Sequence, residues 1–501
     1  CVNCVVMSVT LTGGGNIDIS NSGALTVTSA TTANGQIKVV STTGDLTVAT
    51  VTASGGITLT ASAGSVLDDG TAANITSSAG TTSVTATGAG KNIGTAANPL
   101  DIDGPGGAVR LTAAGGAVHV NTVTAGDVEF KSSAVNVTDI TTQFTQGGQT
   151  YSATYVDDVA GHFTVRANGN ILDTDGIAVL VPDATLTMAS SAVAGSIGTA
   201  AKPVLTAAKT LSLTGTTTGE IVLTESDGVT LASANTGSGN INVVSAAGNL
   251  SVGTVTTTGG VTLQATAGAI TDGNGATNNV TAASLTAAAG TGIDLDTTLG
   301  TLASVSVTGT GAIDIANTGA LTVTSANTTN GAIKLSASGN IVVGSVTATG
   351  NSVTLATTAG AINEATNDDG APVADIAAGS VSLTATTGIG TTSRLDLNVP
   401  TVTLATTGTG GIALRDAAAT STYTNVNTTG AGAIDLLSTG AATLTSVTAN
   451  SGTITANAGG NIAVGTVTAA GNSVTLATTA GTINEASADD GAPVADITAG
   501  S

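Results

Sequence analysis

The stretch that decides the fold lies near the start of the chain, at residues 15–66: GNIDISNSGALTVTSATTANGQIKVVSTTGDLTVATVTASGGITLTASAGSV. Short runs open on glycine and alternate apolar with polar residues, which is the pattern of β-strands with one buried face. The runs return at a fixed interval, which is marked by Ile17, Ile37 and Ile57. A second row keeps nearly the same spacing, at Leu25, Leu46 and Val66. The spacing predicts a coil of about 20 residues with two or three short strands.

Closely similar segments recur along the chain. Residues 339–380 align without gaps with residues 460–501, and 35 of the 42 positions are identical. Together with weaker matches they define four related blocks, at about 15–90, 219–300, 311–400 and 432–501. Self-similarity of this kind marks a repeat architecture, in which each unit buries its apolar face against its neighbours.

The composition favours a β-repeat over a helical one. The 501 residues include 68 Gly, no Trp, three Phe and three Tyr, and Thr, Val, Ala and Ser are abundant. β-Branched residues favour strands, and the chain is short of the Leu, Glu, Lys and Arg that fill helical repeats. We therefore expect an all-β solenoid of parallel sheets that continues as a single domain over residues 1–501. About 25 coils at roughly 4.8 Å would make a rod on the order of 120 Å long.

The charge of the chain bears on its partners. The formal net charge is −22, with only 10 Lys and Arg. This argues against nucleic acid and against anionic lipid, since the phosphates of both would be repelled. No apolar run approaches the roughly 18 residues of a membrane helix, so we expect no membrane insertion.

Both cysteines, Cys1 and Cys4, lie at the start of the sequence in a C-x-x-C pattern. The pattern is compatible with a boundary feature, with a disulfide within or between subunits, and with redox chemistry or lipid attachment. The opening CVNCVVM has neither the basic segment nor the cleavage pattern of a signal peptide. We therefore expect that residue 1 is not the start of the gene product.

Strand openings of the form Gly-Asn-Ile-x-Val, and the segments IGTAANPLDID (93–103) and IGTAAKPVLTA (197–207), resemble the filamentous-haemagglutinin-like, two-partner-secreted and giant β-strand-repeat adhesins of bacteria. The resemblance covers nearly the whole chain. It implies a right-handed parallel β-helix that is exported to the cell surface and acts as a stalk, fibre or adhesive shaft. The secretion domain and the carboxy-terminal anchoring region of such proteins are not recognisable in the sequence.

An acidic turn follows the same strand in each of the four blocks. Calcium binds several converging hard oxygens, and stacked Asp-Asp-Gly turns are a candidate source of them. The alternative is an ordinary solvated turn, in which the Asp side chain bonds to its own backbone. Calcium is thus the one candidate cofactor. The candidate ligands are Asp68, Asp69, Asp272, Asp368, Asp369, Asp489 and Asp490.

Residues 128–170 interrupt the repeat pattern and hold five of the six aromatic residues. We expect an irregular insertion, in the form of a hairpin or loop over the solenoid. Exposed aromatic faces stack on sugars, so this segment is the candidate binding site; the alternative is that the rings pack the insertion onto the rod. The candidate ligand-binding residues are Tyr151, Tyr155, His162 and Phe163.

Two further function classes have weaker support. Some parallel β-helices are polysaccharide-active enzymes, whose acid and base come from adjacent coils, whereas Asp157, Asp158 and His162 are only a few residues apart. Ice binding needs the same Thr-x-Thr on every coil, and runs such as LTVTS at 25–29 are interrupted. We expect no catalytic residues and no enzymatic activity.

The function we expect is that of an extracellular structural or adhesive fibre at the cell surface. The alternative is a carbohydrate- or cell-binding adhesin module that acts through residues 128–170. The sequence stops at Ser501, whereas the corresponding Ser380 continues into VSLTATTGIG, and a solenoid cut there leaves an unpaired sheet edge. We therefore expect end-to-end partners, either further repeats of a longer chain or other copies in a head-to-tail filament. A host or neighbouring cell surface is the other expected partner.

Overall fold

The computed structural model describes the chain except for residues 1–5, 72–73, 81, 96, 104–108, 115–117, 123–127, 133–138, 147–148, 157–161, 168, 174–178, 192, 368–372, 407, 488–494 and 501. Between residues 103 and 184, side chains are described only at 113, 118–120 and 169–173. The described residues form strands and turns without a helix, as a parallel β-solenoid of about 19 turns with about 21 residues per turn. The predicted fold class is confirmed, and the expected number of about 25 coils is wrong.

Two compact units divide the chain, unit 1 at Cys1–Gly259 and unit 2 at Gly260–Ser501. The strands of unit 1 are β1 (Val6–Leu11), β2 (Ile17–Asn21), β3 (Leu25–Thr32), β4 (Ile37–Ser41), β5 (Leu46–Val48), β6 (Val51–Ala53), β7 (Ile57–Ala61), β8 (Val66–Asp68), β9 (Ile75–Ser77), β10 (Thr82–Ala86), β11 (Leu100–Asp103), β12 (Val109–Ala114), β13 (Val118–Thr122), β14 (Val128–Ser132), β15 (Asp139–Gln146), β16 (Gln149–Val156), β17 (His162–Ala167), β18 (Ile171–Asp173), β19 (Val179–Ser190), β20 (Val204–Thr214), β21 (Ile221–Glu225), β22 (Val229–Asn235), β23 (Ile241–Ser245) and β24 (Leu250–Thr256).

The strands of unit 2 are β25 (Gly260–Ala265), β26 (Ala269–Asp272), β27 (Val280–Ala289), β28 (Gly292–Val307), β29 (Ile313–Asn317), β30 (Leu321–Thr328), β31 (Ile333–Ala337), β32 (Ile341–Thr357), β33 (Ala361–Glu364), β34 (Ile376–Ala385), β35 (Gly388–Ile389), β36 (Leu395–Asn398), β37 (Thr401–Thr406), β38 (Ile412–Asp416), β39 (Thr420–Thr428), β40 (Ile434–Ser438), β41 (Ala441–Ala449), β42 (Ile454–Ala458), β43 (Ile462–Ala469), β44 (Val474–Thr478), β45 (Ile483–Glu485) and β46 (Ile497–Ala499).

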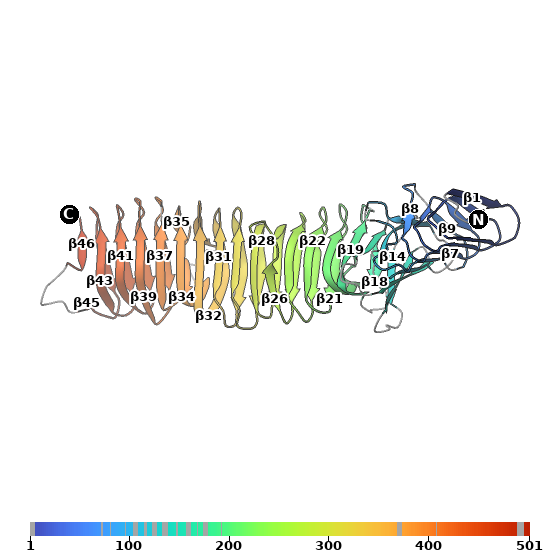
Figure 1. The fold of residues 1–501 in the computed structure, drawn as a ribbon. Coiled ribbons are helices and arrows are strands. Elements are labelled where there is room, and N and C mark those ends of the chain that lie inside the picture. Colours follow the sequence, from blue (N-terminus) through green and yellow to red (C-terminus); the bar gives the residue numbers. More distant parts are fainter. Residues whose placement is uncertain are drawn as a thin grey trace. The chain divides into compact units, whose positions relative to one another are not determined.

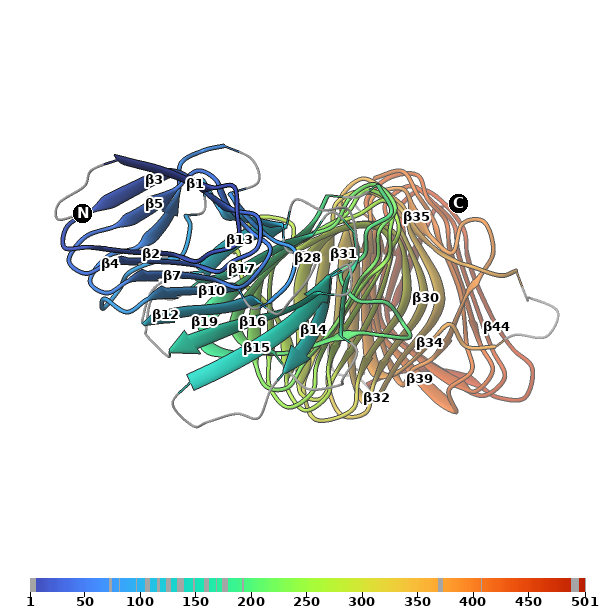
Figure 2. The ribbon, with the colours of Figure 1, turned by 90° about the vertical axis from the view of Figure 1, so that its right-hand side faces the viewer.

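In unit 1 the predicted repeat is observed at the first coils. β2, β4 and β7 pair in parallel, with Ile17 opposite Ile37 and Ile37 opposite Ile57. The next steps of the same sheet are longer, because Ile57 lies opposite Thr82 and Thr82 lies opposite Val109. The strands lie side by side in Figure 2. The additional residues lie between the paired strands, which is why the coils are fewer than a uniform period predicts.

Part of the segment at 128–170 belongs to the sheets of unit 1. β15 pairs antiparallel with β14 on one side and with β16 on the other. β16 also pairs in parallel with β12, and β17 pairs in parallel with β13 and β19. The strands β16 and β17 are therefore solenoid strands, and β15 is the strand that reverses the direction between β14 and β16.

In unit 2 the parallel pairing continues with a regular register. Ile293, Ile313, Ile333 and Val353 lie opposite one another on β28, β29, β31 and β32. The step from β32 to β34, from Val353 to Val381, is longer than the earlier steps of this row, because more residues lie between the two paired strands. Figure 1 shows the strands of this unit stacked side by side, with turns along both sides.

The interior of both units is filled by stacked aliphatic side chains. Leu59, Val39, Leu335 and Leu355 are fully buried, and along strands such as β7 and β31 buried residues alternate with half-buried or exposed ones. Each side chain stacks on a similar one from the next coil, so the narrow core is filled with few aromatic residues. Tyr423 is an exception, since its ring is fully buried and its hydroxyl lies 2.8 Å from Ser438 Oγ.

Buried hydroxyl groups satisfy the carbonyl groups of the turns. Ser41 Oγ lies 2.7 Å from the carbonyl oxygens of both Gly23 and Gly44, either of which can accept its single hydrogen, and Thr357 Oγ1 donates to the carbonyl oxygen of Gly360 at 2.7 Å. Buried carbonyl groups require such partners. Similar bonds are made by Thr32, Ser77, Ser190, Thr236, Ser245, Thr257, Thr328, Thr406, Thr428 and Thr478.

Candidate functional site

The candidate ligand-binding residues lie on two solenoid strands of unit 1. Tyr151 and Tyr155 lie on β16, opposite Val109 and Ala113 of β12. His162 and Phe163 lie on β17, next to β19. The side chains of these four residues are outside the described part, so their role as a binding surface stays a prediction. Asp157 and Asp158, considered for acid–base chemistry, are also outside it.

The acidic turn of the first block is closed by its own chain. Asp68 accepts a hydrogen bond from the backbone N–H of Gly70. Asp69 Oδ1 accepts bonds from the backbone N–H and the hydroxyl of Thr71, at 3.1 and 2.6 Å. Burial, followed by the neighbouring carboxylates Asp101 and Asp69, raises the pKa of Asp68. One oxygen of each of the two carboxylates is thus hydrogen-bonded within the turn.

The acidic turn of the second block, residues 272–279, is a more complete hydrogen-bonded loop. Asp272 Oδ1 accepts bonds from the backbone N–H groups of Asn274 and Gly275, at 2.8 and 3.0 Å, and from Asn279 Nδ2, at 2.8 Å. Asn279 is fully buried, and its Oδ1 accepts the backbone N–H of Asp296 at 2.8 Å. These donors, the Asn279 amide first, lower the pKa of Asp272.

Four candidate calcium ligands, Asp368, Asp369, Asp489 and Asp490, lie outside the described residues. Within the described residues, no group of three or more His, Cys, Asp or Glu side chains is arranged to hold a metal ion. In the turn at 272–279, the Asp272 carboxylate organises the loop through amide donors.

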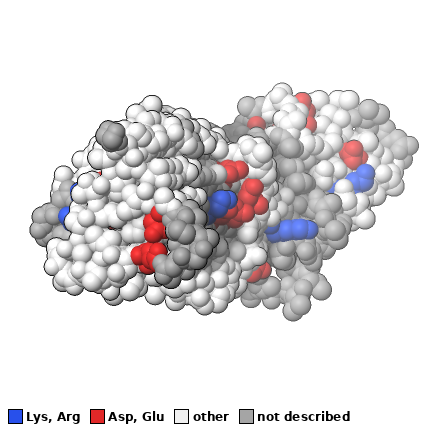
Figure 3. Space-filling view, turned by 90° about the vertical axis from the view of Figure 1, so that its left-hand side faces the viewer, with Lys and Arg blue, Asp and Glu red and all other residues white. Residues whose placement is uncertain are grey.

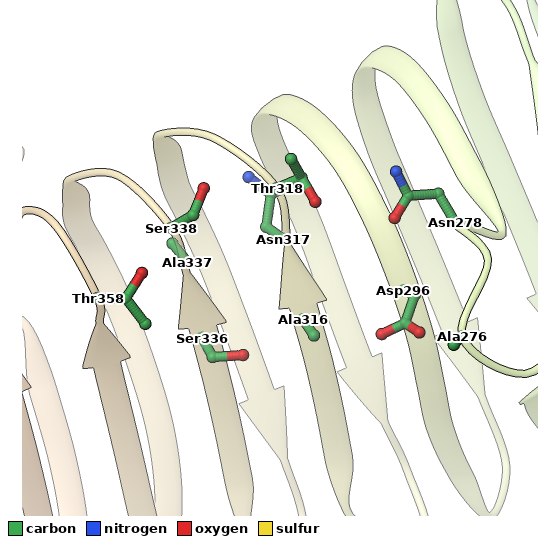
Figure 4. Close-up of a pocket in the computed structure, with 10 residues that line it drawn as sticks. All are labelled: Ala276, Asn278, Asp296, Ala316, Asn317, Thr318, Ser336, Ala337, Ser338 and Thr358. Atoms are coloured by element: carbon green, nitrogen blue, oxygen red, sulfur yellow. The ribbon is translucent and has the colours of Figure 1, made fainter.

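This loop forms one wall of a groove of about 300 Å³ in unit 2 (Figure 4). Asp296, Ala316 and Ser336 lie opposite one another on β28, β29 and β31 and form the floor. The other lining residues come from the loop and from the ends of strands in successive coils: Ala276, Asn278, Asn317, Thr318, Ala337, Ser338 and Thr358. The groove therefore runs across the coils, and it is lined by hydroxyl, amide and methyl groups with one carboxylate.

The surface beside the groove is acidic. Asp294 and Asp314 lie in the neighbouring outward row, and Lys334 binds Asp314 at 2.9 Å. Loss of water contact, followed by the carboxylates of Asp314, Asp272 and Asp296, raises the pKa of Asp294. Elsewhere charge is sparse, and most of the described surface visible in Figure 3 is neither acidic nor basic. An anion would be repelled from the groove.

Two carboxyl groups are buried at the last inward position of a strand, where the equivalent strands of other coils carry Ser, Thr, Asn or Ala. Glu225 in unit 1 is fully buried and accepts bonds from Thr206 Oγ1 at 2.6 Å and from the backbone N–H of Ala208 at 3.0 Å. Burial raises the pKa of Glu225 to about 7, and the nearby Asp227 carboxyl contributes. Asp416 in unit 2 accepts the backbone N–H groups of Val399 and Ala418, and burial raises its pKa.

Sequence reasoning found Asp272 and missed the groove and Glu225. The run IVLTE at 221–225 alternates strictly, so Glu225 has the same inward phase as Ile221 and Leu223. That phase was a signal for a buried carboxyl. The groove had no such signal, because its floor comes from ordinary outward positions of three coils.

Comparisons of the chain with protein-family models, curated proteins and solved structures give no match. The described part of the chain contains no helix of the length and apolar character needed to cross a membrane. The chain is a β-solenoid repeat protein.

Proposed function

We propose that the chain is a structural segment of an extracellular fibre or stalk at a bacterial cell surface. The observation that carries this proposal is the register of the coils: in each unit, successive strands pair in parallel and place like aliphatic residues over one another. A stack of this kind grows by adding coils without changing its core, and its stability comes from contacts between neighbouring coils.

The character of the surface supports the same role. The outward positions carry mainly Thr, Ser, Asn and Ala, and the net charge of −22 favours solubility of a long β-sheet surface. The exposed ion pair between Lys38 and Asp18 spans 3.9 Å and contributes little to stability. The near-identity of residues 339–380 and 460–501 further supports a protein that lengthens by duplication of coils.

The proposed fibre has two kinds of partner and no catalytic role. End-to-end neighbours, as further repeats or further copies, extend the fibre, and a host or neighbouring cell surface is the adhesive partner. The resemblance of the strand openings to bacterial adhesin repeats supports this part. The proposed role involves no enzymatic activity and no cofactor.

Immunogold electron microscopy of intact cells that produce the protein tests the location. Antibodies raised against the full recombinant chain should label the outside of the cells, and treatment of the intact cells with proteinase K should remove the label. A strain without the gene is the control for specificity. Label that appears only after the cells are permeabilised would refute the proposed location, and with it the fibre role.

A further inference from the structure

The groove of unit 2 between the loop at 272–279 and the coils that follow has the geometry of a preformed binding site. Its wall is fixed by the bonds of Asp272 to Asn274, Gly275 and Asn279. Asn278 Nδ2 is also fixed, since it donates to Thr298 Oγ1 at 2.6 Å. A wall that is ordered before binding spares a ligand the entropic cost of ordering it. A volume of about 300 Å³ is at the lower end of ordinary ligand sites.

The chemistry of the lining restricts the ligand. The floor strands β29 and β31 are paired on both sides, so the groove offers no free strand edge to an extended peptide. Ala316 and Ser336 are too small to form the apolar pockets that anchor a helix or an acyl chain. The lining contains no Lys or Arg, and Asp296 faces it, which disfavours phosphate, sulfate and nucleic acid.

The remaining groups are those that bind sugar hydroxyls. Hydroxyl groups donate and accept, and the lining offers the Asp296 carboxylate, the Asn278 amide and the hydroxyls of Ser336, Ser338 and Thr358 (Figure 4). The floor residues repeat at the strand spacing of about 4.8 Å, which is close to the length of one sugar ring in an extended chain.

We propose that this groove binds an uncharged oligosaccharide segment, laid across the coils, through Asp296, Asn278 and the hydroxyl groups of the following turns. The inference is independent of the fibre role and of residues 128–170, because it depends only on the residues of this groove. A fibre with such a groove along its side would hold a neutral polysaccharide of its surroundings.

Affinity electrophoresis of the full chain in native gels tests this proposal. The gels contain dextran, laminarin, galactomannan or xyloglucan as neutral probes, and alginate as an anionic probe. At least one neutral polymer should retard the wild-type protein, and alginate should not. Ser336→Tyr fills the floor of the groove and should abolish retardation. Asp296→Ala removes a charged hydrogen-bond partner and should weaken binding about tenfold or more.

The matched control is Asn457→Tyr, at the position of the fourth block that corresponds to Ser336, outward on β42 and away from the groove. It should bind like the wild type. Circular dichroism checks that each variant is folded, and Asp296→Ala alone decides if Ser336→Tyr does not fold. The proposal is overturned if no neutral polymer retards the protein, if alginate alone does, if both groove variants still bind, or if the control loses binding equally.

Discussion

Substituting one glycine of a turn should force two neighbouring coils apart. A Cβ atom at Gly331 would lie 1.9 Å from the carbonyl oxygen of Gly311, in the coil before, whereas real Cβ contacts stay beyond 3.0 Å. In Gly331→Ala the two turns must therefore separate by about 1 Å. The adjacent hydrogen bond from Ile313 N–H to the Ala332 carbonyl, now 2.9 Å, would then exceed the normal range. Overpacking and the lost bond together cost about 3 kcal/mol.

Hydrogen–deuterium exchange of the full chain, resolved by mass spectrometry, measures this effect where it occurs. A cost of about 3 kcal/mol corresponds to roughly 100-fold faster exchange. Peptides that contain Ile313 and Ile333 should show this acceleration, while peptides of unit 1 should not change. Gly300→Ala is the matched control, because its nearest atom would lie 3.4 Å away. Exchange in Gly331→Ala within about threefold of the wild type would refute the close approach of the two turns.

Three further predictions concern the core, a buried carboxyl and the loop. Leu335→Ala should lower the free energy of unfolding by about 2–5 kcal/mol in urea, whereas Lys334→Ala, which removes an exposed ion pair, should cost less than about 1 kcal/mol. The raised pKa of Glu225, about 7, means that the folded state holds a proton the unfolded state releases above about 4.5, so stability should fall as the pH rises between these values. The urea midpoint of Glu225→Gln should lack this slope, and an unchanged slope would refute the assignment. Asp272→Ala should lower the free energy of unfolding by about 1–3 kcal/mol and speed hydrogen exchange in residues 272–279, because the carboxylate binds Asn279 and backbone amides. EDTA should leave the hydrogen exchange of this turn in the wild-type protein unchanged, because these groups already bind the carboxylate. Slower exchange with added calcium would contradict this explanation.

The sequence was sufficient to predict the strands and the way they stack. Ile17, Ile37 and Ile57 are predicted to share a row, and they do. The length of the turns was harder to predict, because an insertion between strands leaves the alternation within each strand intact. Nothing in the sequences of β7 and β10 indicates that Thr82 lies opposite Ile57. The step between them is longer than a uniform coil, and longer steps reduce the number of coils in the chain.

The candidate site depended on contacts that a one-dimensional pattern does not contain. Asp272 was visible as an acidic turn, but its chemistry is set by Asn279, seven residues later, whose amide donates to it. Ser336 reads as an ordinary outward residue of a strand. It becomes part of a groove because the loop at 272–279, three coils earlier, lies beside the same row of outward residues.

Disulfide trapping tests whether the strands stack in parallel with additional residues between them. In a Cys1→Ser, Cys4→Ser background, Thr354→Cys with Ser382→Cys joins outward residues that lie opposite each other on β32 and β34. Thr354→Cys with Ala374→Cys instead tests a uniform period of about 20 residues. Paired positions of adjacent strands suit the Cα separation of a disulfide, roughly 4.4–6.8 Å. The observed register predicts rapid cross-linking of the first pair and none of the second, measured by mass spectrometry after mild oxidation. Cross-linking of the second pair without the first would refute this register.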